Sequence, residues 1–515
     1  MTTSTSPITF VVGAFDGLEP DPATIDRLRR GMPGVSLFRE ANLRSAAQVK
    51  ALTDGIHEAV GSLPALVAID QEAGQLQALA GIVTDFPGNM AMTATGDLSL
   101  AERVGEAIGH ELRALGVTVN YAPVCDLLTI ATNHGLSIRS FGSDPDEAAS
   151  FAAAIVDGLQ RAGVAATGKH FPGKGAAEVD THYGHAVINR TREEFDESEL
   201  VPFRSVIKSD VKLMMTSHAT VPALSGGALV PATRSADVLT GVLRDELGFH
   251  GVTITDALDM AGVGAGEHAS NDESYEALQA GADLLLTTPF MDIDVLESGI
   301  GGSMEASSGR SSLADSGPRV RELREWLAGF TTPSSDAVGC EAHRDLSAEV
   351  ARRSLTLREG HVRRAIGPRC VVIEPERVNL TKADTTNDNE ASLVDELASG
   401  RVAPIHHGVS HAPTDGEIDA AVDALSGADD AVVVVTAAAT EPGQVELVRR
   451  VIAAGVPATV VVARNPLDAE YLDLDPSTQV IFTYGFTEST VRALGAALIT
   501  TRPLEGKLPI ANRGA

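Results

Sequence analysis

Residues 248–260 read GFHGVTITDALDM, and the pattern in this stretch decides how the chain folds. An apolar, β-branched run leads into Thr255 and Asp256, and the residues that follow look like the start of a helix. A carboxylate at this position can act as a nucleophile. It can equally cap the helix, because Asp is favoured just before the first helical turn. The local sequence leaves both interpretations open.

Runs of this kind recur along the first part of the chain, and segments with helical spacing separate them. Continuous apolar strands that alternate with helices predict a parallel sheet covered by helices. Eight repeats favour a (β/α)₈ barrel, although periodicity alone also allows an open doubly wound sheet. The eight predicted strands are Ile8–Ala14, Val35–Phe38, Ala65–Asp70, Val117–Tyr121, Val164–Lys169, Lys212–His218, Val252–Asp256 and Ala282–Thr287. Predicted helices between them include Leu100–Leu115, Glu147–Ala162, Glu193–Ser209 and Ser235–Leu247.

Polar side chains end or follow four of these strands, namely Asp70, Lys169, His218 and Asp256. The carboxyl ends of barrel strands form one face, and the loops that follow them build the active site of barrel enzymes. We therefore expect these four side chains to share one face. Each of them alone can also be a helix cap or a polar loop residue.

Residues 168–185, GKHFPGKGAAEVDTHYGH, contain a second group of reactive side chains. A predicted strand ends in Lys169 and His170, and a Pro/Gly turn leads into a long loop with Asp180 and His182. A basic pair at a strand end can clamp sugar hydroxyls. Asp180 and His182 can form a carboxylate-oriented imidazole, which suits proton transfer. Both can instead be exposed polar loop residues.

The sequence changes character after the predicted barrel. Residues 299–317, GIGGSMEASSGRSSLADSG, are rich in Gly and Ser and predict a flexible loop. Thr331–Gly339 is a candidate linker, and an α/β pattern follows it. We therefore predict a barrel domain over residues 1–335 and a second α/β domain over residues 336–515. The second domain carries neither a GxGxxG fingerprint nor a P-loop.

Composition restricts the partners. The chain has 515 residues, with 70 acidic and 40 basic side chains and a formal net charge of −30. Nucleic acids and anionic membranes require a basic face, so neither is an expected partner. The N-terminus does not resemble a secretory signal, and no apolar stretch is long enough to span a membrane. We expect a soluble, cytoplasmic protein, and a homodimer is left open.

The sequence implies no metal and no cofactor. Cys125, Cys340 and Cys370 lie far apart and show no CxxC spacing. His182 and His185 are three residues apart, but the loop setting and Asp180 suit catalysis better than zinc binding.

The motif KHFPGxGxxxxDxH at residues 169–182, followed by GFxGVxITDALxM at residues 248–260, resembles family 3 of the glycoside hydrolases. The likeness is closest to the bacterial β-N-acetylhexosaminidase branch, and it extends over nearly the whole chain. C-terminal segments such as ARRSLTL, ARNPLD, TYGFTEST and GKLPI resemble the α/β sandwich domain of two-domain members. Other matching segments are IDQEAG (69–74), NYAPVCD (120–126), IRSFGSDP (138–145) and MTSHATVPAL (215–224).

This resemblance implies a role for each matching residue. Asp256 corresponds to the family nucleophile, which forms a covalent glycosyl-enzyme, and His182 to the general acid/base, with Asp180 as its partner. Retaining hydrolysis needs one carboxylate at the anomeric carbon and one proton donor at the leaving oxygen, and an imidazole near its own pKa can be that donor. The expected contacts to a small carbohydrate substrate are made by Asp70, Arg139, Lys169 and His170, with His218 as a further candidate.

The chain departs from the family pattern around Asp70. The family usually reads DQEGGRVxR where this chain reads DQEAGQLQA, so Gln75 and Ala78 replace arginines, and Lys174 stands where histidine is common. An Arg-to-Ala change removes a fork of donors. We predict a retaining β-N-acetylglucosaminidase of cell-wall recycling. The alternatives are a family member with another sugar preference, a glycoside phosphorylase, and a non-catalytic sugar-binding descendant. A phosphorylase is possible because an imidazole base, unlike a carboxylate, does not repel phosphate.

Overall fold

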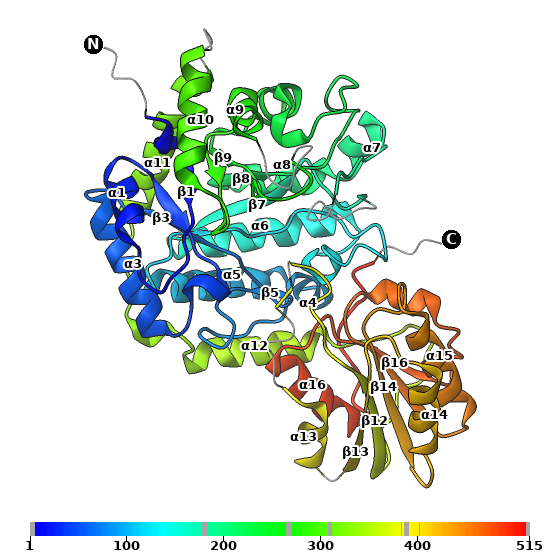
Figure 1. The fold of residues 1–515 in the computed structure, drawn as a ribbon. Coiled ribbons are helices and arrows are strands. Elements are labelled where there is room, and N and C mark those ends of the chain that lie inside the picture. The colour runs from blue at the N-terminus through cyan, green and yellow to red at the C-terminus, as the bar shows by residue number, and fades with distance from the viewer. Residues whose placement is uncertain are drawn as a thin grey trace.

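The computed structural model describes residues 6–177, 184–263, 270–306, 312–382, 384–385, 391–400 and 402–510. Its N-terminal part is an eight-stranded parallel sheet surrounded by helices (Figure 1). The strand order is β10-β1-β2-β3-β6-β7-β8-β9, so sheet neighbours follow each other along the chain. The strands are β1 (Val11–Gly13), β2 (Gly34–Ser36), β3 (Leu66–Ile69), β6 (Val119–Asn120), β7 (Ala165–Phe171), β8 (Leu213–Thr216), β9 (Val252–Ile254) and β10 (Leu285–Leu286).

The two ends of this sheet meet. Ile254 in β9 forms a parallel bridge with Leu284, which directly precedes β10, and the Thr255 N–H donates to the Leu284 carbonyl at 3.0 Å. The sheet is therefore a nearly closed barrel, consistent with the predicted (β/α)₈ fold, and not an open doubly wound sheet. Apolar side chains from β1, β3, β6, β8 and β9 form one buried cluster, as expected for a small barrel that side chains fill.

The helices around the barrel occupy the predicted spaces between strands, with small shifts at their ends. The predicted helix over Glu193–Ser209 is interrupted and forms two shorter helices, α7 and α8. The barrel helices are α1 (Pro22–Arg29), α2 (Arg39–Asn42), α3 (Ala46–Val60), α4 (Asn89–Ala94), α5 (Leu98–Ala114), α6 (Pro145–Arg161), α7 (Arg192–Glu197), α8 (Leu200–Lys208), a π-helical segment (Asp237–Glu246), α9 (Asn271–Ala280), α10 (Ile293–Ala306) and α11 (Ser316–Ala328).

Local sequence signals place helix α6. The Asp144 side chain accepts a hydrogen bond from the Glu147 N–H at 2.9 Å, and Pro145 occupies the first turn. Both residue types are favoured at these positions. Gly158 then lets α6 lie close to α5, because a Cβ at Gly158 would stand 2.2 Å from the Glu102 carbonyl oxygen. The Asp144 cap thus fixes where α6 begins, and Gly158 sets how closely α6 packs on α5.

The Gly/Ser-rich stretch after β10 is partly helical, so the prediction of a loop over 299–317 was wrong for its first residues. Helix α10 continues to Ala306 and buries Leu296 and Ile300. Gly299 lies against α9, because a Cβ there would stand 2.1 Å from the side chain of Asn271. Close packing of two helices therefore outweighs the low helix propensity of glycine.

The C-terminal part contains a six-stranded sheet with the order β11-β16-β15-β14-β12-β13. All of its neighbouring pairs are parallel except β11 and β16. The strands are β11 (Thr356–Leu357), β12 (Arg369–Pro375), β13 (Ala403–Val409), β14 (Asp430–Val435), β15 (Ala458–Val462) and β16 (Gln479–Phe482). The helices are α12 (Glu341–Ser354), α13 (Leu393–Ala398), α14 (Asp415–Asp423), α15 (Pro442–Ala453) and α16 (Glu488–Leu498).

Alternate residues of these strands belong to two different buried clusters. Val433 packs in one cluster with residues of α14 and α15, and Val434 packs in the other with residues of α13 and α16. Helices thus cover both faces of the sheet (Figure 1), and both faces are buried, as its nearly continuous apolar strands indicate. In the described part of the chain, every helix is too short or too polar to cross a membrane.

Asp468 is a buried carboxyl group in the C-terminal part, just after β15. Its Oδ1 accepts from the Ala439 N–H at 2.9 Å, and its Oδ2 has no hydrogen-bond partner among the described residues. Burial raises the pKa of Asp468 to about 7 from an ordinary value of 3.8. The folded state therefore holds this proton more tightly than the unfolded state, and stability is lost as the pH rises between these two values.

We expect Asp468→Asn to stabilise the protein by about 4 kcal/mol at about pH 8 and by much less at about pH 4. Asparagine keeps an acceptor for the Ala439 N–H but carries no charge to bury. Thermal melting of both proteins across this pH range measures the difference. A difference in melting temperature that does not change with pH would contradict the raised pKa.

Candidate active site

The barrel brings the four predicted strand ends to one face, and side chains from three of them form a charged cluster. Asp70 directly follows β3, Lys169 and His170 lie in β7, and Asp256 is the second residue after β9. Lys169 Nζ is 2.6 Å from Asp70 Oδ1, and His170 Nε2 is 3.9 Å from Asp256 Oδ2. These contacts join β3, β7 and β9 at the carboxyl ends of their strands, where barrel active sites form.

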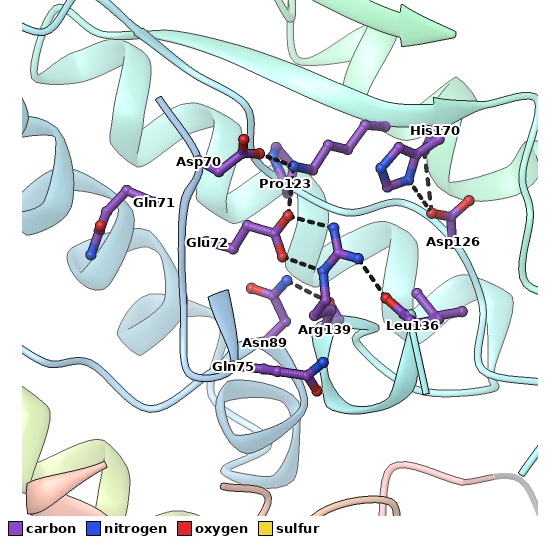
Figure 2. Close-up of polar contacts among 12 residues, drawn as sticks. Asp70, Gln71, Glu72, Gln75, Asn89, Pro123, Asp126, Leu136, Arg139 and His170 are labelled. Atoms are coloured by element: carbon purple, nitrogen blue, oxygen red, sulfur yellow. Dashed lines mark hydrogen bonds and ion pairs between the residues drawn. The ribbon is translucent and has the colours of Figure 1, made fainter. Parts of the chain in front are cut away.

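Glu72 is the centre of the charged network beside β3 (Figure 2). Its Oε1 lies 2.5 Å from Lys169 Nζ, and its two oxygens accept from Arg139 Nη2 at 2.7 Å and Arg139 Nε at 2.8 Å. Burial alone would raise the pKa of Glu72, but the adjacent Arg139 and Lys169 lower it to about 2. The paired oxygens make this a bidentate, charge-assisted contact that fixes both cations.

Asp70 connects this network to solvent. Its side chain is 33% exposed, whereas the side chains of Lys169 and Glu72 are 2% and 0% exposed. Burial would lower the pKa of Lys169, but Asp70 and Glu72 raise it overall, so the ammonium stays charged. Asp70 is therefore the acid of this group that is open to a ligand.

A buried hydrogen bond orients His170. Its Nδ1 lies 2.7 Å from Asp126 Oδ2, and the backbone N–H groups of His170 and Lys174 also donate to the Asp126 carboxylate. Burial, reinforced by the charge of Lys174, keeps the pKa of His170 well below its ordinary value. A neutral imidazole that donates Nδ1–H to a carboxylate presents Nε2 as an acceptor, and here Nε2 faces Asp256.

The two oxygens of Asp256 have different surroundings. Oδ1 accepts from the Ala257 N–H at 2.9 Å, while Oδ2 lies 3.9 Å from His170 Nε2 and 4.0 Å from Lys174 Nζ. These two distances are too long for direct hydrogen bonds. Residues 257–263 form turns and not a helix, so the interpretation of Asp256 as a helix cap is wrong.

His218 contacts the residue next to Asp256. Its Nδ1 is 2.9 Å from Thr233 Oγ1, and its Nε2 is 3.0 Å from the carbonyl oxygen of Ala257. The residue is 1% exposed. The imidazole thus contacts the backbone of the residue that follows Asp256. The sequence pattern put His218 at a strand end but gave no sign that both ring nitrogens contact the protein.

Asp180 and His182 lie outside the described residues. At the altered positions near Asp70, the Ala78 N–H donates to the Asp70 carbonyl at 2.9 Å, and Gln75 Nε2 donates to the His134 carbonyl at 3.3 Å. The Arg39 guanidinium reaches this segment, because its Nη1 donates to the carbonyl of Ala80 at 2.8 Å. A guanidinium from the first residue of α2 therefore lies near the position where the family arginine is missing.

The C-terminal part contacts the two loops that carry this network. Thr385 donates from its backbone N–H to the Gln75 carbonyl at 2.8 Å and accepts from the Gln77 N–H on its Oγ1 at 3.1 Å. Asn465 Nδ2 donates to the Ala131 carbonyl at 2.8 Å. These contacts brace the segment after β3 and the segment that leads to Arg139.

Glu72 and Asp126 are site residues that the sequence reasoning missed. Both lie inside motifs that it singled out, IDQEAG and NYAPVCD, yet each acid had no visible partner there. The sequence carries no local signal for these roles, because a buried acid must be paired and the partners of both acids lie far along the chain. Among the described residues, no three His, Cys, Asp or Glu side chains are grouped so that they could hold a metal ion.

Comparisons with known proteins match this architecture. Residues 28–303 match the family model described as the glycosyl hydrolase family 3 N terminal domain. A β-hexosaminidase A of Pseudoalteromonas piscicida is 34% identical over 358 residues, which cover 64% of this chain and 59% of that protein. A β-hexosaminidase of Nitrosomonas eutropha is 36% identical over 271 residues, which cover 51% of this chain and 76% of that protein.

A third relative is named β-N-acetylglucosaminidase/β-glucosidase, from Cellulomonas fimi, and is 33% identical over 65% of this chain and 61% of its own length. The matched region thus spans less than two thirds of the first two relatives. The solved structure of a glycoside hydrolase family 3 β-N-acetylglucosaminidase from Paenibacillus sp. str. FPU-7 superposes with a TM-score of 0.90 at 30% identity, over 99% of both chains.

Proposed function

Because the chain belongs to glycosyl hydrolase family 3, we propose that it is a retaining exo-β-N-acetylglucosaminidase with Asp256 as its nucleophile. The observation that supports this most is the placement of Asp256 Oδ2, which faces His170 and Lys174 at the carboxyl ends of the barrel strands. The names of the relatives from Pseudoalteromonas piscicida and Nitrosomonas eutropha agree with this substrate class.

The proposed reaction has two displacements. Asp256 attacks the anomeric carbon while His182, oriented by Asp180, protonates the leaving oxygen, and the sugar is held as an ester on Asp256. His182 then deprotonates a water that attacks the same carbon and releases Asp256, so the configuration is retained. Asp180 holds the tautomer of His182 and stabilises the imidazolium between these steps.

Of the remaining site residues, one is proposed to contact the sugar and the others to hold the site in place. Asp70 is proposed to accept from a sugar hydroxyl, because its carboxylate is the exposed one in the network. Lys169 and Arg139 support it through Glu72, and His218 positions the backbone next to Asp256. We assign this chemistry to the barrel domain, residues 1–335, and a bracing role to an α/β sandwich domain over residues 336–515.

A panel of 4-nitrophenyl β-glycosides tests the substrate class. The expected result is the highest kcat/KM on the 2-acetamido-2-deoxyglucoside. A higher value on another sugar would favour the alternative that Gln75 and Ala78 suggest, and no turnover of any sugar would favour a binding protein. The same assays at saturating phosphate distinguish hydrolysis, which gives free sugar, from phosphorolysis, which gives a sugar 1-phosphate.

His182→Ala is expected to slow hydrolysis of an N-acetylglucosaminide with an alkyl leaving group by a factor of about 10² to 10⁴, the usual range for a lost acid/base. The 4-nitrophenyl substrate should lose much less, because its leaving group needs little protonation. The exposed neighbour His185, changed to Ala, is the matched control and should change neither rate. Equal losses on both substrates in the His182 variant would argue against the acid role.

A further inference from the structure

Lys174 is a charged side chain that the mechanism above does not use. It lies in the PGKG turn after β7, where Gly175 is required because a Cβ there would stand 1.9 Å from the Leu127 carbonyl oxygen. The Lys174 N–H donates to Asp126 Oδ1 at 2.7 Å, and its side chain is 8% exposed. Backbone packing and a buried carboxylate thus fix the start of this side chain, and its ammonium ends 4.0 Å from Asp256 Oδ2.

Lys174 differs from the other two cations of the site. Lys169 and Arg139 are held by Asp70 and Glu72 at 2.5 to 2.7 Å. Within the described ranges, the ion pair nearest to Lys174 Nζ is the one with Asp256 at 4.0 Å, which is beyond hydrogen-bond length. An ammonium has three donors, so Lys174 retains donors for a bound molecule beside the nucleophile.

His170 supplies the complementary group on the same side of Asp256. Its Nε2 is an acceptor, because Nδ1–H is committed to Asp126, and it lies 3.9 Å from the same Asp256 oxygen. In a retaining enzyme the anomeric carbon rests on the nucleophile, and the substituent on the next carbon lies beside it. One donor and one acceptor therefore flank the place of the 2-substituent.

We propose that Lys174 and His170 together recognise the 2-acetamido group of the sugar bound at Asp256. Lys174 Nζ donates to the acetamido carbonyl oxygen, and His170 Nε2 accepts from the acetamido N–H. A 2-hydroxyl group can satisfy one of these partners but is too short to satisfy both. The inference rests on the proposed function, because it takes Asp256 as the nucleophile. It makes Lys174, where the family commonly has histidine, a determinant of specificity.

The test compares wild type with Lys174→Met and Lys174→Arg on two 4-nitrophenyl substrates, the β-N-acetylglucosaminide and the β-glucoside. Loss of a charge-assisted hydrogen bond should lower kcat/KM of the methionine variant on the acetamido substrate by about 10- to 100-fold. The glucoside should lose less, about threefold, because its 2-hydroxyl can donate to His170 Nε2 and then does not need Lys174. The arginine variant keeps a cationic donor and should recover part of the selectivity.

A second pair of substrates separates recognition from a structural effect. A 2-trifluoroacetamido group is a weaker carbonyl acceptor, so wild type should prefer the acetamido substrate more strongly than Lys174→Met does. The inductive effect of fluorine on the anomeric carbon is the same for both enzymes and cancels in the comparison. Equal losses on the acetamido substrate and the glucoside, with an unchanged fluorine effect, would overturn the role of Lys174 and leave the proposed function intact. A wild type that hydrolyses the glucoside but not the acetamido substrate would overturn both.

Discussion

The Asp256→Asn variant is expected to lose turnover of the 4-nitrophenyl substrate by a factor on the order of 10⁴ or more, as when another covalent catalyst loses its nucleophile. The amide cannot form the glycosyl ester, so the first displacement has no nucleophile. The fold should persist, because the amide oxygen can still accept from the Ala257 N–H that Oδ1 uses. Steady-state kinetics and a melting curve on the same preparation measure both quantities.

Asp259→Asn is the matched control for this experiment. Asp259 lies in the same turn, three residues on, and its Oδ2 accepts from Thr288 Oγ1 at 2.7 Å. This variant should keep its activity within about threefold, because an amide oxygen can accept the same hydrogen bond. A sharper check uses Asp256→Ala with azide, which should restore turnover and give the α-glycosyl azide, since azide then attacks the face that Asp256 left. Formation of the β-azide would identify Asp256 as the acid/base.

Glu72→Gln is expected to lower the free energy of unfolding by about 3 to 5 kcal/mol, the usual effect of breaking a buried ion pair on one side. The carboxylate of Glu72 contacts both Lys169 and Arg139 at 0% side-chain exposure. An amide has one oxygen acceptor and no charge. The buried cations Lys169 and Arg139 would then lose the negative charge between them, and Asp70 would be the remaining acid of the group. Activity should fall as well, because Lys169 and Asp70 lose their fixed positions.

The pH dependence identifies the cause of this loss. The pKa of Glu72 is about 2 in the folded protein, against an ordinary value of 4.5. Ionised Glu72 therefore contributes full stability above pH 4.5, and this contribution is lost as the pH falls toward 2. The difference between wild type and Glu72→Gln in denaturant titrations should narrow over that range. Glu488→Gln, which removes an exposed partner of Arg492, should cost less than about 1 kcal/mol, and an equally small loss for Glu72→Gln would refute the network.

Periodicity was sufficient to predict the barrel strands, because each strand is buried on both faces and reads as a continuous apolar run. It was also sufficient to place Asp70, Lys169 and Asp256 at one end of the barrel. It could not distinguish a nucleophile from a helix cap at Asp256, because that depends on whether residues 257–263 form turns or a helix. Periodicity also missed the first part of helix α10, because the packing of Gly299 against Asn271 depends on the neighbouring helix.

Glu72, Asp126 and Lys174 could not be assigned from the sequence because their roles depend on partners far along the chain. Glu72 meets Lys169 and Arg139 only when β3, β7 and the segment before α6 come together. Asp126 contacts His170 directly although the two residues are 44 apart along the chain. The departure at Lys174 was visible, but its distance from Asp256 was not.

Covalent trapping tests the central claim, that Asp256 forms a glycosyl-enzyme, most directly. A 5-fluoro analogue of an N-acetylglucosaminyl fluoride slows both displacements but keeps a good leaving group, so the ester accumulates. Intact mass spectrometry followed by peptide mapping then locates the sugar. The expected result is one glycosyl unit per chain, attached to Asp256, and absent from Asp256→Asn. A sugar on a different carboxylate, or turnover with inverted configuration and no adduct, would contradict the account.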